Sequence, residues 1–157
     1  MLVMEKNNLA EEIESLVNKY GKNRSSLMQI LQEIQRKYHH ISDYAQQEIA
    51  RLLDIHPVEV HSVITFYSFL LDKERGRNIV RLCKTIMCDL YDKESIEKAI
   101  TRELGISFGE TTADKRITLE YTNCLGMCDR GPAMLVNDKV YTNLDPETAV
   151  KILNEIK

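Results

Sequence analysis

The sequence contains no tryptophan, little proline and glycine, and no hydrophobic run long enough to cross a membrane. Its 157 residues include three prolines and six glycines, and they are 43% hydrophobic and 29% charged. These proportions are typical of a folded globular protein and not of a disordered one. No apolar stretch approaches the ~20 residues of a membrane-spanning helix. The N-terminal stretch turns acidic before a signal-peptide core could form, so we expect a cytoplasmic protein.

The chain also lacks an excess of positive charge, which argues against nucleic acid as a partner. It has 21 Lys and Arg residues against 24 Asp and Glu residues, a formal net charge of −3. Nucleic-acid surfaces normally gather basic side chains on one face. The sequence has one local basic run, which we predict to be a solvated connector or, less simply, a contact for an acidic partner: Lys73, Arg75, Arg77, Arg81 and Lys84.

The first part of the chain, residues 1–72, is predicted to be a four-helix bundle. Apolar residues recur at helical spacing in four segments, 8–21, 25–38, 41–53 and 56–71. Asn8 and Ser42 are candidate N-caps, and Pro57 suits a first helical turn. We expect the aromatic residues near the end of the fourth segment to lie in the core of the bundle or to contact a partner: Phe66, Tyr67 and Phe69.

The second part, residues 73–157, changes from helices to a mixed pattern. Short strands are predicted at 79–82 and 117–122, with a helix between them at 93–105. A hairpin turning at Asn137-Asp138 and a closing helix capped by Asp145 follow. This order of strands and helices is the connectivity of a thioredoxin-like fold. The overall prediction is therefore an α+β protein, with a helical bundle followed by a thioredoxin-like α/β domain.

The four cysteines all lie in this second part, in two pairs. Cys83 and Cys88 follow the first predicted strand and enclose four residues, whereas Cys124 and Cys128 follow the second strand and enclose three. Parallel strands of a βαβ unit end at the same side of the sheet, which is also where such sheets usually bind ligands. We therefore expect the four sulfur atoms to converge.

Several chemistries use four converging thiols. Disulfides do not persist in a reducing compartment, and the Cys-x-x-Cys spacing of thioredoxin-type redox sites is absent. Zinc and a [2Fe–2S] cluster both accept four thiolates, and the spacing leaves both open. The loop composition favours iron, because Gly126 permits a close backbone approach and four apolar side chains could limit access of water: Ile86, Met87, Leu125 and Met127. The four histidines are expected to be surface or packed residues and not ligands.

The cysteine pattern within "NCLGMCDRGPAMLVND" resembles the 24-kDa subunit family of NADH:quinone oxidoreductase (the E subunit in bacteria), whose module recurs in NAD-linked hydrogenases and formate dehydrogenases. The likeness extends to "VEVHSVITFYSFL" and "VYTNLDPETAVKIL", and so to nearly the whole chain. It implies a thioredoxin-like ferredoxin domain with one [2Fe–2S] cluster. The implied ligands are Cys83, Cys88, Cys124 and Cys128.

The resemblance also implies an electron-transfer subunit of an NAD(H)-dependent oxidoreductase complex. FMN and NAD(H) would be bound by a flavoprotein partner, with further iron–sulfur subunits beyond it. This chain has no Gly-x-Gly-x-x-Gly motif and no predicted catalytic residue of its own. There are two alternatives. One is a zinc-stapled adaptor, in which the four thiols bind zinc only to hold the loops together. The other is a free-standing ferredoxin-like shuttle, which carries electrons without belonging to a complex. Arg130, beside the last cysteine, could stabilise a reduced cluster or form a surface ion pair, and the isomer of Pro132 is left open.

Overall fold

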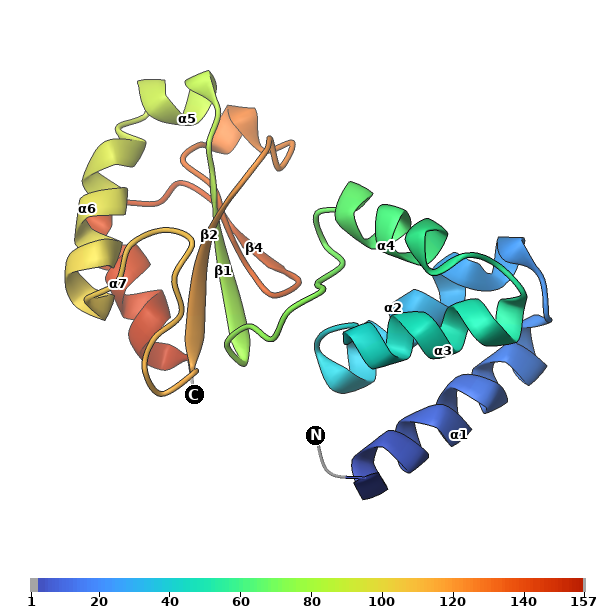
Figure 1. The fold of residues 1–157 in the computed structure, drawn as a ribbon. Coiled ribbons are helices and arrows are strands. Elements are labelled where there is room, and N and C mark those ends of the chain that lie inside the picture. The colour runs from blue at the N-terminus through green and yellow to red at the C-terminus, as the bar shows by residue number, and fades with distance from the viewer. Residues whose placement is uncertain (1–2, 157) are drawn as a thin grey trace. The chain divides into compact units, whose positions relative to one another are not determined.

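The computed structural model describes residues 3–156, and the chain divides into two compact units, Met1–Glu74 and Arg75–Lys157. Within the described residues, the first unit contains helices, and the second combines helices with a four-stranded sheet (Figure 1). A mixed helix-and-sheet architecture is therefore confirmed. Among the helices of residues 3–156, none has both the length and the apolar character that a bilayer span requires.

The helices of the first unit surround one apolar core. Ile13, Ile30, Ile34 and Ile49 are almost completely buried there, together with Val60. These residues fall at the helical spacing seen in the sequence, so burial of one face of each helix holds the unit together. The elements are α1 (Val3–Tyr20), a 3-10 turn (Arg24–Ser26), α2 (Leu27–Tyr38), α3 (Asp43–Leu53) and α4 (Pro57–Phe66).

The predicted helix starts are partly right. The Ser42 hydroxyl accepts a hydrogen bond of 3.3 Å from the Ala45 backbone N–H, as expected of an N-cap. The prediction for Asn8 is wrong, since α1 begins at Val3 and Asn8 lies inside it. Glu5 and Lys6 are good helix formers and allow the helix to start earlier than the capping signal indicates.

The helix α4 ends at Phe66, five residues before the end of its predicted segment. Beyond it, the backbone N–H of Leu71 donates to Gln35 Oε1 at 3.0 Å, and the Leu71 carbonyl accepts from the Ile41 N–H at 2.7 Å. These long-range hydrogen bonds hold the chain out of the helical conformation. Tertiary contacts therefore override the local apolar pattern.

The aromatic side chains at the end of α4 are exposed and not in the core. Phe66 is 79% exposed, and Tyr67 and Phe69 are about half exposed. The rings of Phe66 and Tyr67 meet edge to face, with centroids 5.0 Å apart. The core alternative for these residues is thus wrong, and contact with a partner stays a prediction.

The sheet of the second unit has the strand order β2-β1-β3-β4. Strands β1 and β2 are parallel, and β3 is antiparallel to both of its neighbours. The predicted connectivity and the hairpin at Asn137 are confirmed, whereas the short helix α5 was not predicted. The bounds are β1 (Asn78–Cys83), α5 (Ile86–Leu90), α6 (Lys93–Leu104), β2 (Ile117–Thr122), a 3-10 turn (Cys128–Arg130), β3 (Met134–Val136), β4 (Lys139–Tyr141) and α7 (Pro146–Glu155).

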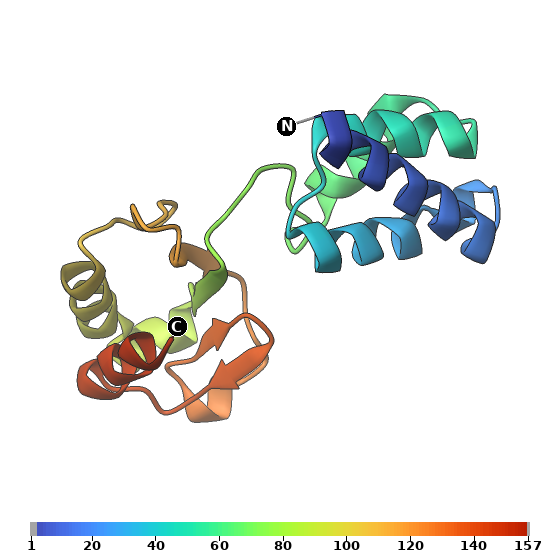
Figure 2. The ribbon, with the colours of Figure 1, turned by 90° about the horizontal axis from the view of Figure 1, so that it is seen from below.

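The helices α6 and α7 cover one face of this sheet (Figure 2). Val80 and Leu82 of β1 are fully buried against Ile96 and Ile100 of α6, and Leu153 of α7 completes the contact. Asp145 caps α7 as predicted, its carboxylate accepting a 2.7 Å hydrogen bond from the Thr148 backbone N–H. The core thus fixes the strands, and through them the loops at their ends.

The basic run is a solvated connector only in part: Lys73, Arg77 and Lys84 are exposed, whereas Arg75 and Arg81 are not, so the prediction is wrong for those two. Arg81 lies within β1 and is 6% exposed, and its Nε lies 3.1 Å from Glu120 of β2. Arg75 Nε lies 3.2 Å from the other oxygen of the same carboxylate. Because Arg81 and Glu120 are register partners across the parallel pair, the strand pairing itself brings these charges together.

The segment entering β1 packs closely against β2 at Gly76. The Gly76 N–H donates to Thr118 Oγ1 at 2.7 Å, and a Cβ on Gly76 would lie 2.8 Å from the backbone carbon of Ile117. We therefore predict that Gly76→Ala lowers the free energy of unfolding of the second unit by about 1–3 kcal/mol, since backbone cannot move aside as a side chain can. Urea unfolding followed by circular dichroism measures this loss.

Glu103→Ala provides the control for this prediction. Glu103 is exposed on α6, and its replacement should change the unfolding free energy by less than about 0.5 kcal/mol. Equal stabilities for the Gly76→Ala and Glu103→Ala variants would show that the backbone of β2 shifts to accommodate the added methyl group.

Candidate metal centre

The four cysteines lie in two loops at one end of the sheet. Cys83 is the last residue of β1 and Cys88 lies in α5, whereas Cys124 follows β2 and Cys128 begins the next 3-10 turn. Cys83 pairs in register with Thr122, so the parallel strands end at the same level. Figure 1 shows α5 and the turn after β2 at this same end.

The two thiols of the first loop are buried. Cys83 and Cys88 are each 2% exposed and pack with Ala133, with Leu125 and Met127 against this group. Burial raises the pKa of the Cys88 thiol, while hydrogen bonds with the Ala133 backbone and the Thr85 hydroxyl act in the opposite direction. Residues from both loops and from the segment before β3 therefore enclose these sulfurs.

The two thiols of the second loop are more accessible and contact each other. Cys124 is exposed, Cys128 is half-buried, and their Sγ atoms are 3.4 Å apart. The Gly126 backbone N–H donates to Cys124 Sγ at 3.3 Å and lowers the pKa of that thiol, and Cys128 lowers it further. Gly126 has a φ of +78°, a conformation that favours glycine and turns its N–H toward the sulfur.

The two pairs interact with each other as well. Hydrogen bonding to Cys124 raises the pKa of the Cys128 thiol, and burial and the charges of Cys88 and Cys83 raise it further. The Cys83 sulfur also helps to lower the pKa of Cys124. The structure therefore places the four predicted site residues at the same end of the sheet, as two pairs.

The donor set can be tested against the two candidate metals. A structural zinc site needs four ligands around one ion, whereas a dinuclear cluster needs two thiolates on each of two irons. Among residues 3–156, no group of three or more His, Cys, Asp and Glu side chains is placed to hold a metal ion. The four thiols lie as two pairs, with one amide donor and apolar neighbours beside them, and thiolates are ligands that suit either metal group.

The surroundings differ in part from the predicted apolar shell. Leu125 and Met127 pack against the buried thiols as expected, but Ile86 is 74% exposed and points away from the core. Arg130 forms a surface ion pair with Asp129, with Nε and Oδ2 3.2 Å apart. The Gly131–Pro132 peptide, whose isomer the sequence left open, is cis and directly precedes Ala133.

The site also includes groups that the sequence did not mark. The Ala133 carbonyl accepts a 3.1 Å hydrogen bond from the backbone N–H of Cys83, at the end of β1. Thr85 places its hydroxyl 3.3 Å from Cys83 Sγ. A threonine directly before a short helix is a common sequence feature, so only the folded loop distinguishes Thr85 from an ordinary helix cap.

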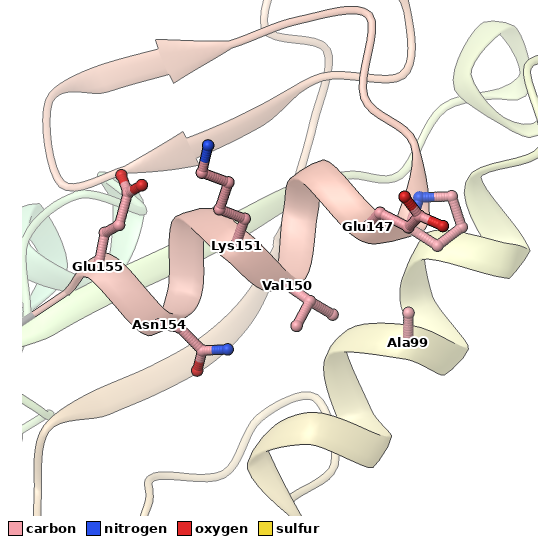
Figure 3. Close-up of a pocket in the computed structure, with 7 residues that line it drawn as sticks. Ala99, Glu147, Val150, Lys151, Asn154 and Glu155 are labelled. Carbon is pink, nitrogen blue, oxygen red and sulfur yellow. The ribbon is translucent and has the colours of Figure 1, made fainter.

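A groove of ~640 Å³ lies elsewhere, between α6 and α7. Val150 of α7 points toward Ala99 of α6 there, and Glu147 and Asn154 stand at its sides (Figure 3). None of the four cysteines lines it. The groove is thus separate from the candidate metal centre.

Comparisons with known proteins show the family of the chain. The sequence profile of the thioredoxin-like [2Fe–2S] ferredoxin family matches residues 13–157. The chain belongs to this family. It is 39% identical to the E subunit of NADH-quinone oxidoreductase of Buchnera aphidicola subsp. Acyrthosiphon pisum, over 94% of this chain and 93% of that relative. It is 33% identical to the corresponding E subunit of Escherichia coli K12, over 94% of this chain and 89% of that relative.

Two longer proteins contain a similar module. The chain is 32% identical to the alpha subunit of the NAD-reducing hydrogenase HoxS of Cupriavidus necator, covering 92% of this chain but 24% of that relative. A crystal structure of an NAD⁺-reducing [NiFe]-hydrogenase in the air-oxidised state superposes with a TM-score of 0.70 and 20% identity. That match covers 80% of this chain and 22% of the other, and it shows that the fold is shared.

The difference in burial between the two pairs predicts an order of thiol reactivity in the reduced, metal-free protein. We expect iodoacetamide to modify Cys124 first, because this thiol is exposed and its pKa is lowered. Cys88 should react last, because it is buried and its pKa is raised. The rate for Cys124 should level off at a lower pH than that for Cys88.

Mass spectrometry of peptides after timed alkylation measures this order. Denatured protein provides the control, because unfolding should remove most of the difference between the two thiols. Equal rates for Cys88 and Cys124 in the folded protein would mean that the first loop opens freely.

Proposed function

We propose that this chain is the electron-transfer subunit of an NAD(H)-dependent oxidoreductase complex and carries one [2Fe–2S] cluster. The proposed ligands are Cys83, Cys88, Cys124 and Cys128. The observation that carries the proposal is the position of these four thiols at one end of the sheet in a member of the [2Fe–2S] family. The complex would be an NADH dehydrogenase, or an NAD-linked hydrogenase or formate dehydrogenase.

When bound, a [2Fe–2S] cluster supplies reversible one-electron chemistry. The chain's own groups would hold it and set its surroundings. Cys83 and Cys88 would anchor it from the buried side, and the Gly126 N–H would stabilise the charge on Cys124. Leu125 and Met127 would limit access of water from the second loop. We assign no catalytic residue to this chain.

A flavoprotein partner that holds FMN and NAD(H) is part of the proposal, with further iron–sulfur subunits beyond it. This chain corresponds to about a quarter of the HoxS alpha subunit, whose name describes it as NAD-reducing. In that relative, the region similar to this chain is part of a polypeptide whose remaining sequence is about three times as long as the region itself. Here the flavoprotein would be a separate chain that binds this one non-covalently.

We propose that the partner covers the cysteine end of the second unit. Electron transfer weakens steeply with distance, so a donor must approach the thiols closely. Ile86 and Leu90, at i and i+4 of α5, are 74% and 75% exposed, and Met87 and Tyr91 are partly exposed beside them. Exposed apolar side chains grouped beside a functional centre are typical of a docking surface.

The first part of the chain, residues 1–72, is proposed to act as a four-helix bundle that contributes a second docking element. Its exposed aromatic side chains, Phe66, Tyr67 and Phe69, support this role. A thioredoxin-like domain of residues 73–157 would then carry the cluster. A free-standing shuttle would have less use for a second docking element.

Ligand replacement tests the cluster assignment. Anaerobically purified protein should be red-brown and contain two irons and two acid-labile sulfides per chain. Cys128→Ser should weaken or shift the visible absorption and alter the electron paramagnetic resonance of the reduced protein, because an alkoxide replaces a thiolate on one iron. Met127→Leu is the matched control, because it removes a neighbouring sulfur that is not a proposed ligand. A colourless protein with one zinc and no labile sulfide would identify the zinc-stapled adaptor instead.

Charge substitutions on α5 test the docking surface. Ile86→Glu and Leu90→Glu should each weaken binding to the purified flavoprotein subunit about tenfold or more, since a carboxylate would be buried at an apolar contact. Titration calorimetry measures the affinity, and an unchanged visible spectrum shows that the metal centre is intact. Val140→Glu, on β4, is the control and should bind normally. Full affinity in both α5 variants would place the partner on another surface.

A further inference from the structure

Thr85 stands between the two buried thiols. It lies two residues after Cys83 and three before Cys88, and its side chain is half-buried. Its Oγ1 is 3.3 Å from Cys83 Sγ, within hydrogen-bonding range for sulfur. One side-chain hydroxyl thus contacts a sulfur that water hardly reaches, since Cys83 is 2% exposed.

The hydroxyl of Thr85 does not cap the helix that follows it. Thr85 is the N-cap residue of α5, a position where threonine normally accepts a hydrogen bond from the second or third backbone N–H of the helix. No such side-chain capping bond forms here. The side chain is therefore directed to sulfur at the cost of a common helix-capping interaction.

The direction of the hydrogen bond follows from the chemistry of the sulfur. Between a thiol and a hydroxyl, either atom can donate. A thiolate that binds a metal has no proton, so Thr85 must then be the donor. The O–H dipole points its positive end at the sulfur and favours additional negative charge there.

We infer that Thr85 is a positioning residue that raises the reduction potential of the bound cluster through its hydroxyl. This inference rests on the proposed function. One-electron reduction adds a negative charge that spreads onto the ligand sulfurs, and hydrogen bonds to those sulfurs are a recognised influence on iron–sulfur potentials. Arg130 is a poorer candidate, because its charge is already paired with Asp129 at the surface.

The test is a redox titration of the purified full-length holoprotein and its variants. Thr85→Val removes the hydroxyl with little change of shape and should shift the midpoint potential to a more negative value. Thr85→Ser keeps a donor and should stay near the wild-type midpoint. Thr122→Val is the matched control, because Thr122 pairs with Cys83 across the sheet, and within residues 3–156 its hydroxyl makes no hydrogen bond to sulfur.

A second readout separates electrostatics from structure. In D₂O, pulsed electron paramagnetic resonance of the reduced wild-type protein should show a deuteron coupling that Thr85→Val lacks and Thr85→Ser retains. Thermal unfolding of the same proteins reports any structural damage. If the Thr85→Val protein does not bind the cluster, Thr85→Ala replaces it in both measurements.

The outcomes distinguish this inference from the proposed function. A red-brown Thr85→Val protein with the wild-type midpoint overturns the role of Thr85 and leaves the electron-transfer assignment intact. Equal shifts in Thr85→Val, Thr85→Ser and Thr122→Val overturn it as well, because the hydroxyl of Thr85 would then have no specific effect. A wild-type protein that contains zinc and no labile sulfide overturns both.

Discussion

The parallel pairing of β1 with β2 is the constraint on which the rest of the candidate centre depends. It places the carboxyl end of each strand at the same level, with Cys83 opposite Thr122. The loops that follow β1 and β2 therefore lie side by side at this end of the sheet. The helices α6 and α7 make this pairing rigid by burying one face of both strands, so the position of the thiols is set by a hydrophobic core that contains none of them.

The two loops that meet at this end are not equivalent. The loop after β1 folds into α5 and buries both of its thiols, whereas the loop after β2 leaves Cys124 exposed. A bound cluster would therefore be held from the inside by one pair and be reached from outside through the other. Ile86 and Leu90 add exposed apolar surface on α5, the helix that contains Cys88. The same asymmetry would give the proposed cluster an anchor and the proposed partner a side from which to approach it.

Much of this arrangement could be predicted from the sequence, and the failures have physical causes. Periodicity predicted both strands and most helices, because apolar faces must be buried wherever the elements pack. It failed at α4, where Leu71 donates a hydrogen bond to Gln35 and accepts one from Ile41, and these bonds hold it out of the helix. It also misjudged Arg81, whose burial depends on a carboxylate 39 residues away in sequence. The cysteine spacing indicated where the thiols meet, but local pattern could not predict which thiols are buried or where the Thr85 hydroxyl points.

The charges around the thiols explain why neutral dipoles matter at this site. Two charges near the thiols in sequence are paired with opposite charges: Lys93 Nζ is 2.6 Å from Asp89, and Arg130 is paired with Asp129, while Lys84 Nζ lies 4.7 Å from the centre of the Tyr121 ring. Paired ions partly cancel at a distance and are further screened by solvent where they are exposed. The Gly126 N–H contacts the sulfur of the exposed Cys124, and the Thr85 hydroxyl contacts that of Cys83, in the buried region where electrostatic interactions are strongest. The electrostatic environment of the thiols is therefore set by the fold of two short loops more than by the net charge of the chain.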